Sequence, residues 1–332
     1  MNALAASLGD PAGIGPELLC EAWARRREER LPPFFAVGGE NLLAAAARMR
    51  GLDVPVRRIA APGEAAHVFS DALPVIGGDD ADYAPGSPAR TGAQLALGSL
   101  QKATALAVAG EAAGVVTCPV SKALLAEVGF AFPGQTEFLA YACGIAEQDA
   151  VMMLAGPSLH TVPLTVHVAL ARVPALLTAA LIVSRSRIVA AALKRDFGLE
   201  RPRLAIAALN PHAGEKGAFG HEERDVIAPA IARLVAEGID VSGPHPADAL
   251  FAERARETYD AAICMYHDQA LIPLKTLDFD RGVNMTLGLP IVRTSPDHGT
   301  AFAIAGQRIA SAGATIAAIR MAGEAAARRA RA

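Results

Sequence analysis

The hydrophobic positions of this chain fall into short uninterrupted runs, separated by longer alanine-rich stretches with helical spacing. Short apolar runs are typical of buried strands, and strands that alternate with helices indicate βαβ units around a largely parallel sheet. A long helical pattern covers 93–109, and a glycine-punctuated helical tail follows residue 300. The runs that predict strands are ALAASL (3–8), FFAVGG (34–39), AGVVTCPV (113–120), AVMMLAG (150–156), LTVHVAL (164–170), LAIAAL (204–209) and AAICMYH (261–267).

The length of 332 residues exceeds what one hydrophobic core normally organises, so we expect two α/β domains. The composition becomes loop-like at FAFPGQTEF, near residues 130–138, and a second crossing is plausible near residue 300. We therefore expect a first domain of residues 1–128 plus 303–332. Residues 129–302 form the second.

Composition and charge narrow the function classes. A formal net charge of −3 gives no broad positive field for nucleic acid or an anionic membrane. An anionic substrate must then be bound by local cations, for which Lys275, Arg281 and Arg293 are grouped in sequence. The four cysteines form no CxxC pair, and the N-terminus lacks a signal-peptide pattern. A cytoplasmic protein is expected, with Cys118 and Cys264 as buried small hydrophobes.

Three histidines lie in or just after strand-like runs: His167, His212 and His267. Polar side chains at the carboxyl ends of parallel strands form the active sites of open α/β sheets. Three neutral imidazoles would leave a divalent ion its full charge and open positions, so the pattern favours a metal-centred active site. A structural role is the alternative for each histidine taken singly. His160 is expected at the surface.

Four further motifs allow both a structural and a functional interpretation. GDPAGIGPE (9–17) is a strand-to-helix turn without the GxGxxG spacing. TCPVSKALL (117–125) leads from a strand end into a helix. In PGQTEFLA (133–140), Thr136 is expected to cap a helix starting at Glu137. SPDHGTAFAIAG (295–306) predicts a tight loop that either holds part of a nucleotide or is a simple turn.

Together the motifs resemble the 4-hydroxythreonine-4-phosphate dehydrogenase family of pyridoxal phosphate biosynthesis. The resemblance covers nearly the whole chain and implies an isocitrate and isopropylmalate dehydrogenase-like fold: two α/β domains with a cleft between them, in a homodimer. It also implies an active site at the subunit interface, with metal ligands from both subunits. The motifs that carry it, in order, are GDPAGIGPE, TCPVSK, PGQTEFLA, LNPHAGEKGAFGHEE, GPHPAD, YHDQALIPLK and RGVNMTLGLPIVRTSPDHGTA.

The resemblance assigns roles residue by residue. It implies that His167, His212 and His267 bind the metal ion. The implied substrate-binding residues are Gln135, Thr136, Lys275, Asn284 and Arg293. Gln135 departs from the family, which usually reads PGHTEFLA, and glutamine cannot titrate near neutral pH.

The implied reaction is NAD- or NADP-dependent oxidation of 4-phosphooxy-L-threonine, with zinc, cobalt or magnesium as the divalent ion. The product, 2-amino-3-oxo-4-phosphooxybutanoate, then decarboxylates to 3-amino-2-oxopropyl phosphate. Candidates for proton transfer or catalytic support are Lys275, Asp248 and Asp268. The cofactor is expected along the GLP and SPDHGT loops, at Gly288, Asp297 and Gly299.

Three alternatives remain at this stage. A related dehydrogenase acting on a threonate or erythronate 4-phosphate, or on a dihydrodiol dicarboxylate, would share most of these motifs. A phosphate acyltransferase would need acyl-CoA and no metal, so the three ligand-like histidines argue against it. A non-catalytic binding protein would have little use for His, Lys, Asn and Arg side chains gathered at strand ends.

Overall fold

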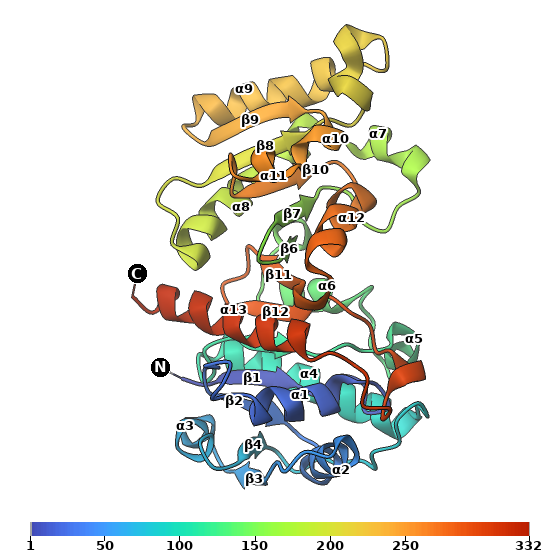
Figure 1. Ribbon diagram of the computed structural model, residues 1–332, viewed down its shortest axis with the longest axis vertical. Helices are drawn as coiled ribbons and strands as arrows, with labels where there is room; N and C mark the ends of the chain where they lie inside the picture. The colour runs from blue at the N-terminus through green and yellow to red at the C-terminus, as the bar shows by residue number, and fades with distance from the viewer. Residues whose placement is uncertain (1, 332) are drawn as a thin grey trace. The chain divides into compact units, whose positions relative to one another are not determined.

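A computed structural model describes residues 2–331 of the chain. By its internal contacts the chain divides into two compact units (Figure 1). Unit 1 comprises residues up to 150 together with 289–331, and unit 2 comprises 151–288. The domain breaks expected after residues 128 and 302 both fall inside unit 1 of this division, and they remain a prediction.

Unit 1 is a wholly parallel α/β unit. Its strands are β1 (Leu4–Ser7), β2 (Phe34–Val37), β3 (Val56–Ile59), β4 (Leu73–Ile76), β5 (Val115–Thr117) and β12 (Arg293–Pro296). They are ordered β3-β4-β2-β1-β5-β12, and every neighbouring pair is parallel. Its helices are α1 (Gly15–Ala24), α2 (Glu40–Arg50), α3 (Ala65–Val68), α4 (Arg90–Val108), α5 (Lys122–Glu127), α6 (Gln135–Ala142) and α13 (Gly313–Arg329).

Small side chains let the helices of unit 1 pack closely on its sheet. Along α4, Ala96, Leu100, Ala103 and Ala107 recur with helical spacing and are buried in the core with strand residues such as Phe35. Helix α13 lies against β12, where the Thr294 hydroxyl donates a hydrogen bond to Ala318 O at 2.8 Å. The alanine-rich composition of the chain therefore reflects close helix–sheet packing.

Unit 2 is a mixed α/β unit. Its strands are β6 (Val151–Ala155), β7 (His160–Pro163), β8 (Arg203–Ala207), β9 (Asp240–His245), β10 (Ala261–Cys264) and β11 (Val283–Leu287). Their order is β11-β6-β7-β10-β8-β9, in which β6 is antiparallel to both neighbours and the other pairs are parallel. Its helices are α7 (Val173–Leu176), α8 (Ala179–Phe197), α9 (Ala228–Ala236), α10 (Ala247–Leu250), α11 (Glu253–Arg256) and α12 (His267–Asp278).

The α/β class predicted from the alternating pattern is confirmed, with two kinds of correction. The run LTVHVAL is not a strand: the strand ends at Pro163, and 164–169 is irregular backbone. The runs also failed to reveal β3, β4, β7, β9, β11 and β12. Most of them contain polar or charged side chains, as RTSP does in β12, so no uninterrupted hydrophobic run marks them. Strand β4 (LPVI) is apolar but only four residues long.

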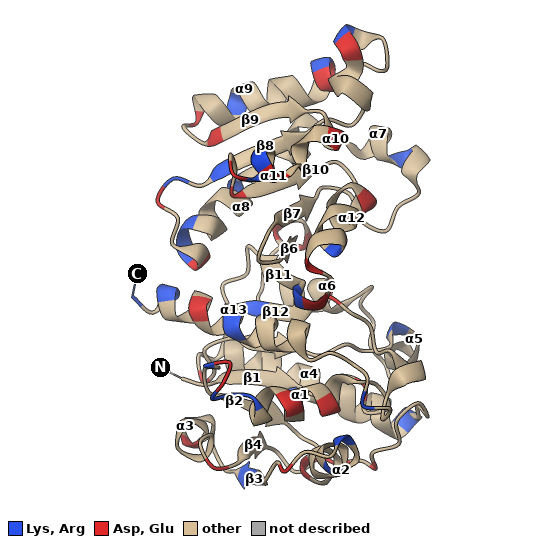
Figure 2. Ribbon diagram, viewed as in Figure 1, with Lys and Arg blue, Asp and Glu red and all other residues tan. Residues whose placement is uncertain are grey.

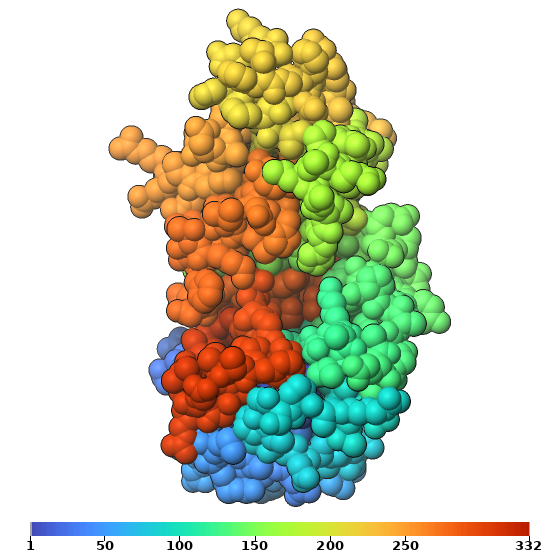
Figure 3. All heavy atoms as spheres, turned by 90° about the vertical axis from the view of Figure 1, so that its right-hand side faces the viewer, coloured from blue at the N-terminus to red at the C-terminus, as the bar shows by residue number. Residues whose placement is uncertain are grey.

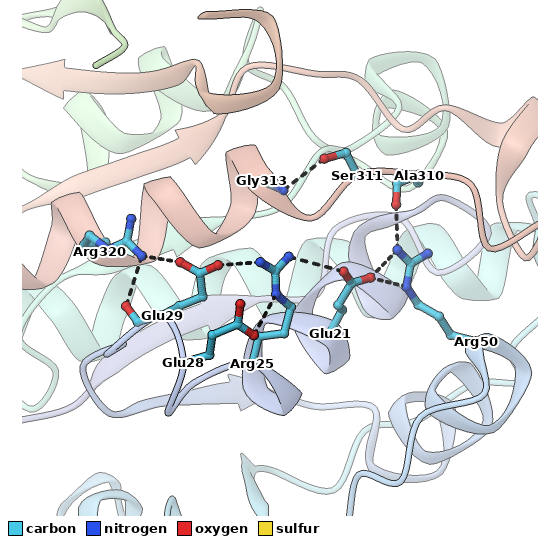
Figure 4. Close-up of polar contacts among 9 residues, drawn as sticks. All are labelled: Glu21, Arg25, Glu28, Glu29, Arg50, Ala310, Ser311, Gly313 and Arg320. Atoms are coloured by element: carbon cyan, nitrogen blue, oxygen red, sulfur yellow. Dashed lines mark hydrogen bonds and ion pairs between the residues drawn. The ribbon is translucent and has the colours of Figure 1, made fainter. Parts of the chain in front are cut away.

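Charged side chains form an ion-pair network within unit 1. Figure 2 shows acidic residues on α1 and both acidic and basic residues on α13, and Figure 4 shows the network that links them. Arg50 at the end of α2 donates to Glu17 at 3.1 Å, to Glu21 at 2.5 Å and to Ala310 O at 2.6 Å. After the end of α1, Glu29 pairs with Arg320 of α13 at 2.6 Å. These contacts fix α1 against α2 and α13.

Two smaller expectations were also tested. Cys118 and Cys264 are buried free thiols, as predicted, and burial raises the pKa of the Cys118 thiol to about 12. Within residues 2–331, no single helix is long and apolar enough to cross a bilayer; only Leu170–Leu176 with Ala179–Phe197 qualifies, as a pair bent by 90°.

Candidate active site

The three histidines singled out in the sequence follow three neighbouring strands of unit 2. His167 follows β7, His267 follows β10 and His212 follows β8. Strand β10 lies between β7 and β8 and is parallel to both, so the three carboxyl ends share one edge of the sheet. The fourth parallel strand, β9, leads at the same edge to Asp248 in α10. This edge is where α/β proteins place their active sites.

His167 and His267 lie together. Their ring centroids are 5.7 Å apart, and both side chains line a cavity of about 230 Å³ with Thr165, Tyr266 and Asp268. His267 Nδ1 is 2.7 Å from Asp268 Oδ1. A proton on Nδ1 is then shared with the carboxylate, which leaves the Nε2 lone pair available to a metal ion. Asp268 therefore orients the His267 ring.

His212 lies in an exposed loop, 211–217, with its ring 6.1 Å from that of Phe219. Five consecutive residues from His212 to Lys216 have positive φ. Within the part of the chain that the structure describes, no three His, Cys, Asp or Glu side chains lie close enough together to hold a metal ion. In a single chain, His212 is thus not grouped with the other two histidines.

Lys275 and Asn284 are the other predicted substrate residues of unit 2. Lys275 is half-buried on α12, seven residues after Asp268 and so on the same helical face. Asn284 lies in β11 opposite Leu154. Its Oδ1 atom is buried and has no hydrogen-bond partner in the structure. Because a buried acceptor without a partner costs about 1–3 kcal/mol, this oxygen fits a bound ligand that donates a hydrogen bond.

In unit 1, the predicted substrate residues Gln135 and Arg293 contact each other. Arg293 is buried at the start of β12, and its Nη2 donates to Thr117 Oγ1 at 2.8 Å and to Gln135 Oε1 at 3.0 Å. Gln135 Nε2 donates in turn to Cys118 O at 3.3 Å. Burial lowers the pKa of Arg293 to about 10, while Glu137 acts in the opposite direction. Arg293 therefore remains a cation at neutral pH.

The expected cap at Thr136 is wrong. Helix α6 begins at Gln135, its N-cap is Gly134 and no side chain caps it. Thr136 is therefore inside the first turn, half-buried beside Gln135. An uncapped first turn leaves backbone N–H groups available, which favours an anion near this helix end. By contrast, Ser121 does cap α5, accepting a hydrogen bond from Leu124 N at 3.5 Å.

The GDPAGIGPE motif packs against the SPDHGT loop. Ile14 N donates to Thr300 O at 3.0 Å, and a Cβ at Gly13 would lie 2.7 Å from the same oxygen. Gly9 has a φ of 70° and would bring a Cβ to within 2.5 Å of Pro119 O. Gly9 is therefore needed for the close approach of Pro119, and Gly13 for that of the SPDHGT loop. The expected cofactor residues of the second loop, Asp297 and Gly299, lie at this point, and Gly288 follows β11 with a φ of 85°.

Three residues around the site were missed from the sequence: Thr117, Glu223 and Gln269. The Thr117 hydroxyl contacts Arg293, Glu223 binds the backbone that leads to His212, and Gln269 joins two strand ends. The sequence feature that could have identified them is a polar residue within an otherwise apolar or glycine-rich motif. Their partners are distant in sequence, and no spacing rule reveals such contacts.

The chain resembles known proteins over its whole length. The family model described as "Pyridoxal phosphate biosynthetic protein PdxA" matches residues 30–322. A curated relative from Erythrobacter litoralis, 4-hydroxythreonine-4-phosphate dehydrogenase, is 63% identical over 98% of this chain and 97% of its own.

Two solved structures complete the comparison. The 4-hydroxythreonine-4-phosphate dehydrogenase of Klebsiella pneumoniae is 36% identical, with a TM-score of 0.86 over 98% of this chain and 100% of its own. A terephthalate 1,2-cis-dihydrodiol dehydrogenase from Burkholderia xenovorans is 27% identical, with a TM-score of 0.66 over 97% and 98%. The chain therefore belongs to the family of pyridoxal phosphate biosynthetic protein PdxA and is, like its curated relatives, a dehydrogenase.

Proposed function

We propose that the chain oxidises 4-phosphooxy-L-threonine at its C3 hydroxyl in vitamin B6 biosynthesis. The hydroxyl oxygen loses its proton to the protein, and C3 loses its hydrogen as a hydride to NAD or NADP. The product, 2-amino-3-oxo-4-phosphooxybutanoate, is a β-keto acid that loses carbon dioxide to give 3-amino-2-oxopropyl phosphate. The observation that carries the proposal is the placement of His167, His212 and His267 at the carboxyl ends of three adjacent parallel strands.

The donor set fits a divalent ion. The ligands that we propose are His167, His212 and His267, and imidazole nitrogens suit zinc or cobalt better than magnesium, which prefers oxygen ligands. His267 is oriented for this role by Asp268 at 2.7 Å. A bound ion would act as a Lewis acid that lowers the pKa of the substrate hydroxyl.

The cationic and amide side chains have separate roles in the proposal. Arg293 and Lys275 bind the anionic groups of the substrate, and Thr136 and Gln135 orient it from the first turn of α6. Asn284 accepts a hydrogen bond from the substrate, which fits its buried and unpartnered Oδ1. In these assignments the cationic side chains bind anions, and the unpartnered acceptor binds a donor.

Proton transfer is assigned to the edge that carries the histidines. Asp268 orients the His267 ring, and Lys275 lies on the same face of α12 as Asp268. Asp248, exposed on α10, is the other candidate for a proton relay. The dinucleotide is proposed to bind along Gly288, Asp297 and Gly299. Gly299 has no atom within 4 Å of a would-be Cβ, which leaves space for a ligand to approach the backbone.

We further propose a homodimer with the active site at the subunit interface. In unit 2, exposed apolar side chains occur on all three segments that carry the histidines. Figure 3 shows the segment containing α7, in lime green, on the surface of unit 2. The exposed residues are Val166, Val168, Leu170 and Leu176 after β7, Phe219 beside His212, and Ile272 and Phe279 on or next to α12. Exposed apolar surface of this kind marks a protein interface.

Free thiols at all four cysteines are consistent with the reducing cytoplasm, where we propose that the enzyme acts.

The decisive experiment follows reduced nicotinamide formation by the metal-supplemented protein with 4-phosphooxy-L-threonine and, separately, with D-threonate 4-phosphate. Turnover of the first alone, abolished by chelation and restored by zinc or cobalt, is the expected result. His267→Ala should lose turnover while retaining the fold, and His67→Ala, at an exposed position of unit 1, is the matched control. Activity in His267→Ala with the metal chelated would overturn the metal role.

One observation favours a second substrate class. Gln135 replaces the histidine usual in the family, and a dihydrodiol dehydrogenase shares the fold at 27% identity. An enzyme that prefers a threonate or erythronate 4-phosphate, or a dihydrodiol dicarboxylate, would keep the same machinery. Preference for D-threonate 4-phosphate in the same assay would select this alternative.

A further inference from the structure

Hydrogen bonds hold each residue of the backbone segment that leads from β8 to His212. We call residues 208–210 the β8 exit. Ala208 N donates to His245 O at 2.8 Å, and Ala208 O accepts from Gln269 Nε2 at 2.8 Å. Leu209 N and Asn210 N both donate to Glu223 Oε1, at 2.9 and 2.7 Å. The Asn210 side chain donates to Glu222 and Glu223.

Gln269 connects this exit to the neighbouring strand. Its Oε1 accepts a hydrogen bond from Met265 N at 2.7 Å, just after β10, while its Nε2 donates to Ala208 O just after β8. The side chain is 7% exposed. A carboxamide is needed here because it donates at one end and accepts at the other. Gln269 therefore joins the two strand ends that lead to His267 and His212.

The loop beyond the exit needs such support. His212, Ala213, Glu215 and Lys216 all have positive φ values, between 42° and 57°. Non-glycine residues in this region cost of the order of 1 kcal/mol or more each and persist only when neighbouring groups hold them. Glu223 lies close to this loop, since a Cβ added at Gly214 would be only 2.6 Å from its Oε2. The conformation of His212 thus depends on groups outside its own loop.

We infer that Gln269 is a positioning residue that, with Glu223, holds the two strand ends that carry His267 and His212. The inference rests on the proposed function, because the role of both histidines as metal ligands is itself proposed. Neither Gln269 nor Glu223 is assigned to the metal ion or to the substrate. Each acts through the backbone: Gln269 through the β10 and β8 ends, and Glu223 through the amides of Leu209 and Asn210.

The test compares the full-length protein with Gln269→Glu and Gln269→Met. Glutamate keeps the size but places an oxygen against Ala208 O, and methionine removes both hydrogen bonds. Gln307→Glu, the same change on an exposed glutamine of unit 1, is the control. The probe is Co²⁺, followed by calorimetry and by its visible absorption.

We expect Co²⁺ affinity to fall about 10- to 100-fold in both Gln269 variants, with an altered absorption spectrum, as is usual when support of metal ligands is removed. Amide hydrogen exchange should accelerate in 208–217 and remain parental in unit 1. Parental Co²⁺ affinity, spectrum and exchange in folded variants would overturn the inference. If both variants fail to fold, Gln269→Asn, which keeps the carboxamide but is one methylene too short to reach both Met265 N and Ala208 O, provides the same comparison with a smaller change.

The two proposals fail in different ways. A parental protein that binds no Co²⁺ contradicts the metal-dependent function, whereas the exchange rates of 208–217 still decide whether Gln269 holds the β8 exit. If the parental protein and both variants bind Co²⁺ equally tightly, the proposed function is retained. Gln269 then has no positioning role.

Discussion

Arg293 is a buried cation whose donors are held in place, as its proposed contact with an anionic substrate requires. Its guanidinium is oriented by Thr117 and Gln135, two neutral acceptors, in a position that is 4% exposed. Although burial lowers its pKa to about 10, it stays charged at neutral pH. A preoriented cation in a desolvated position binds a phosphate or carboxylate more strongly than the same charge in water.

Arg293→Lys should therefore raise the KM for 4-phosphooxy-L-threonine by roughly 10- to 100-fold, because one ammonium cannot reproduce the fixed donors of a guanidinium. Steady-state kinetics measure the effect. Arg57→Lys, on the exposed face of β3, is the control and should keep the parental KM. An unchanged KM in Arg293→Lys would remove Arg293 from the proposed substrate contacts.

His160 was expected at the surface, and the structure corrects this. The residue is half-buried in β7, with its ring 5.2 Å from that of Phe197 and its Nδ1 3.0 Å from Asp260 O. Desolvation lowers the pKa of His160 below its usual value of 6.5. As pH falls, the unfolded chain takes up this proton before the folded chain does, so His160 stabilises the fold above pH 6.5 and less below it.

The free energy of unfolding should accordingly decrease from about pH 8 to about pH 5, and His160→Gln should reduce that decrease. Urea unfolding of both proteins at the two pH values gives the difference. His67→Gln, an exposed histidine, should leave the pH dependence parental. An identical pH dependence in His160→Gln and the parent would contradict the assignment.

At the scale of elements, the strands explain both what the sequence could predict and what it could not. Apolar runs that end in a histidine marked β10, and β8 and β7 also lead to the other two histidines. The order β7-β10-β8 could not be predicted from the sequence, because β10 is distant in the chain from the strands it pairs with. Likewise Arg293 and Gln135 are 158 residues apart, so their contact has no local signal. Strand β12 was not predicted because its side chains are polar. Hydrogen bonds such as the one that Thr294 donates allow these side chains to be buried.

The ion-pair network between α1, α2 and α13 provides a prediction for helix packing. The Arg50 side chain is 7% exposed and that of Glu17 is 1% exposed. Arg50→Met would leave the Glu17 carboxylate buried without its cation, at a cost of about 3–5 kcal/mol. The thermal midpoint of unfolding should fall by roughly 10 °C.

Differential scanning calorimetry measures this shift. The exposed pair of Arg224 and Asp225 provides the matched control, since Arg224→Met removes a surface ion pair that solvent already screens. Its midpoint should remain parental. A parental midpoint in Arg50→Met would show that the network does not stabilise unit 1.

At the scale of the whole molecule, the incomplete grouping of histidines within one chain agrees with a site shared between two chains. His167 and His267 share a cavity, while His212 lies outside it in an exposed loop. The exposed apolar residues around all three would be covered in a dimer.

Subunit complementation tests the shared site. His212→Ala and His267→Ala should each be inactive as homodimers. Unfolded and refolded together in equal amounts, they should recover about a quarter of parental activity, because half of the dimers are mixed and each has one intact site. Two copies of His212→Ala refolded alone are the control. No recovery from the mixture, with mixed dimers present, would place all ligands in one chain.

The position of β10 between β7 and β8 also determines when this site can exist during synthesis. Strands β7 and β8 are made first and pair with β6 and β9, but they do not pair with each other and are joined only by the strand that begins at Ala261. The link from Gln269 to Ala208 can form only later still. A nascent chain therefore contains His167 and His212 well before β10 joins the strands that precede them. The proposed metal site can form only after β10 has been made.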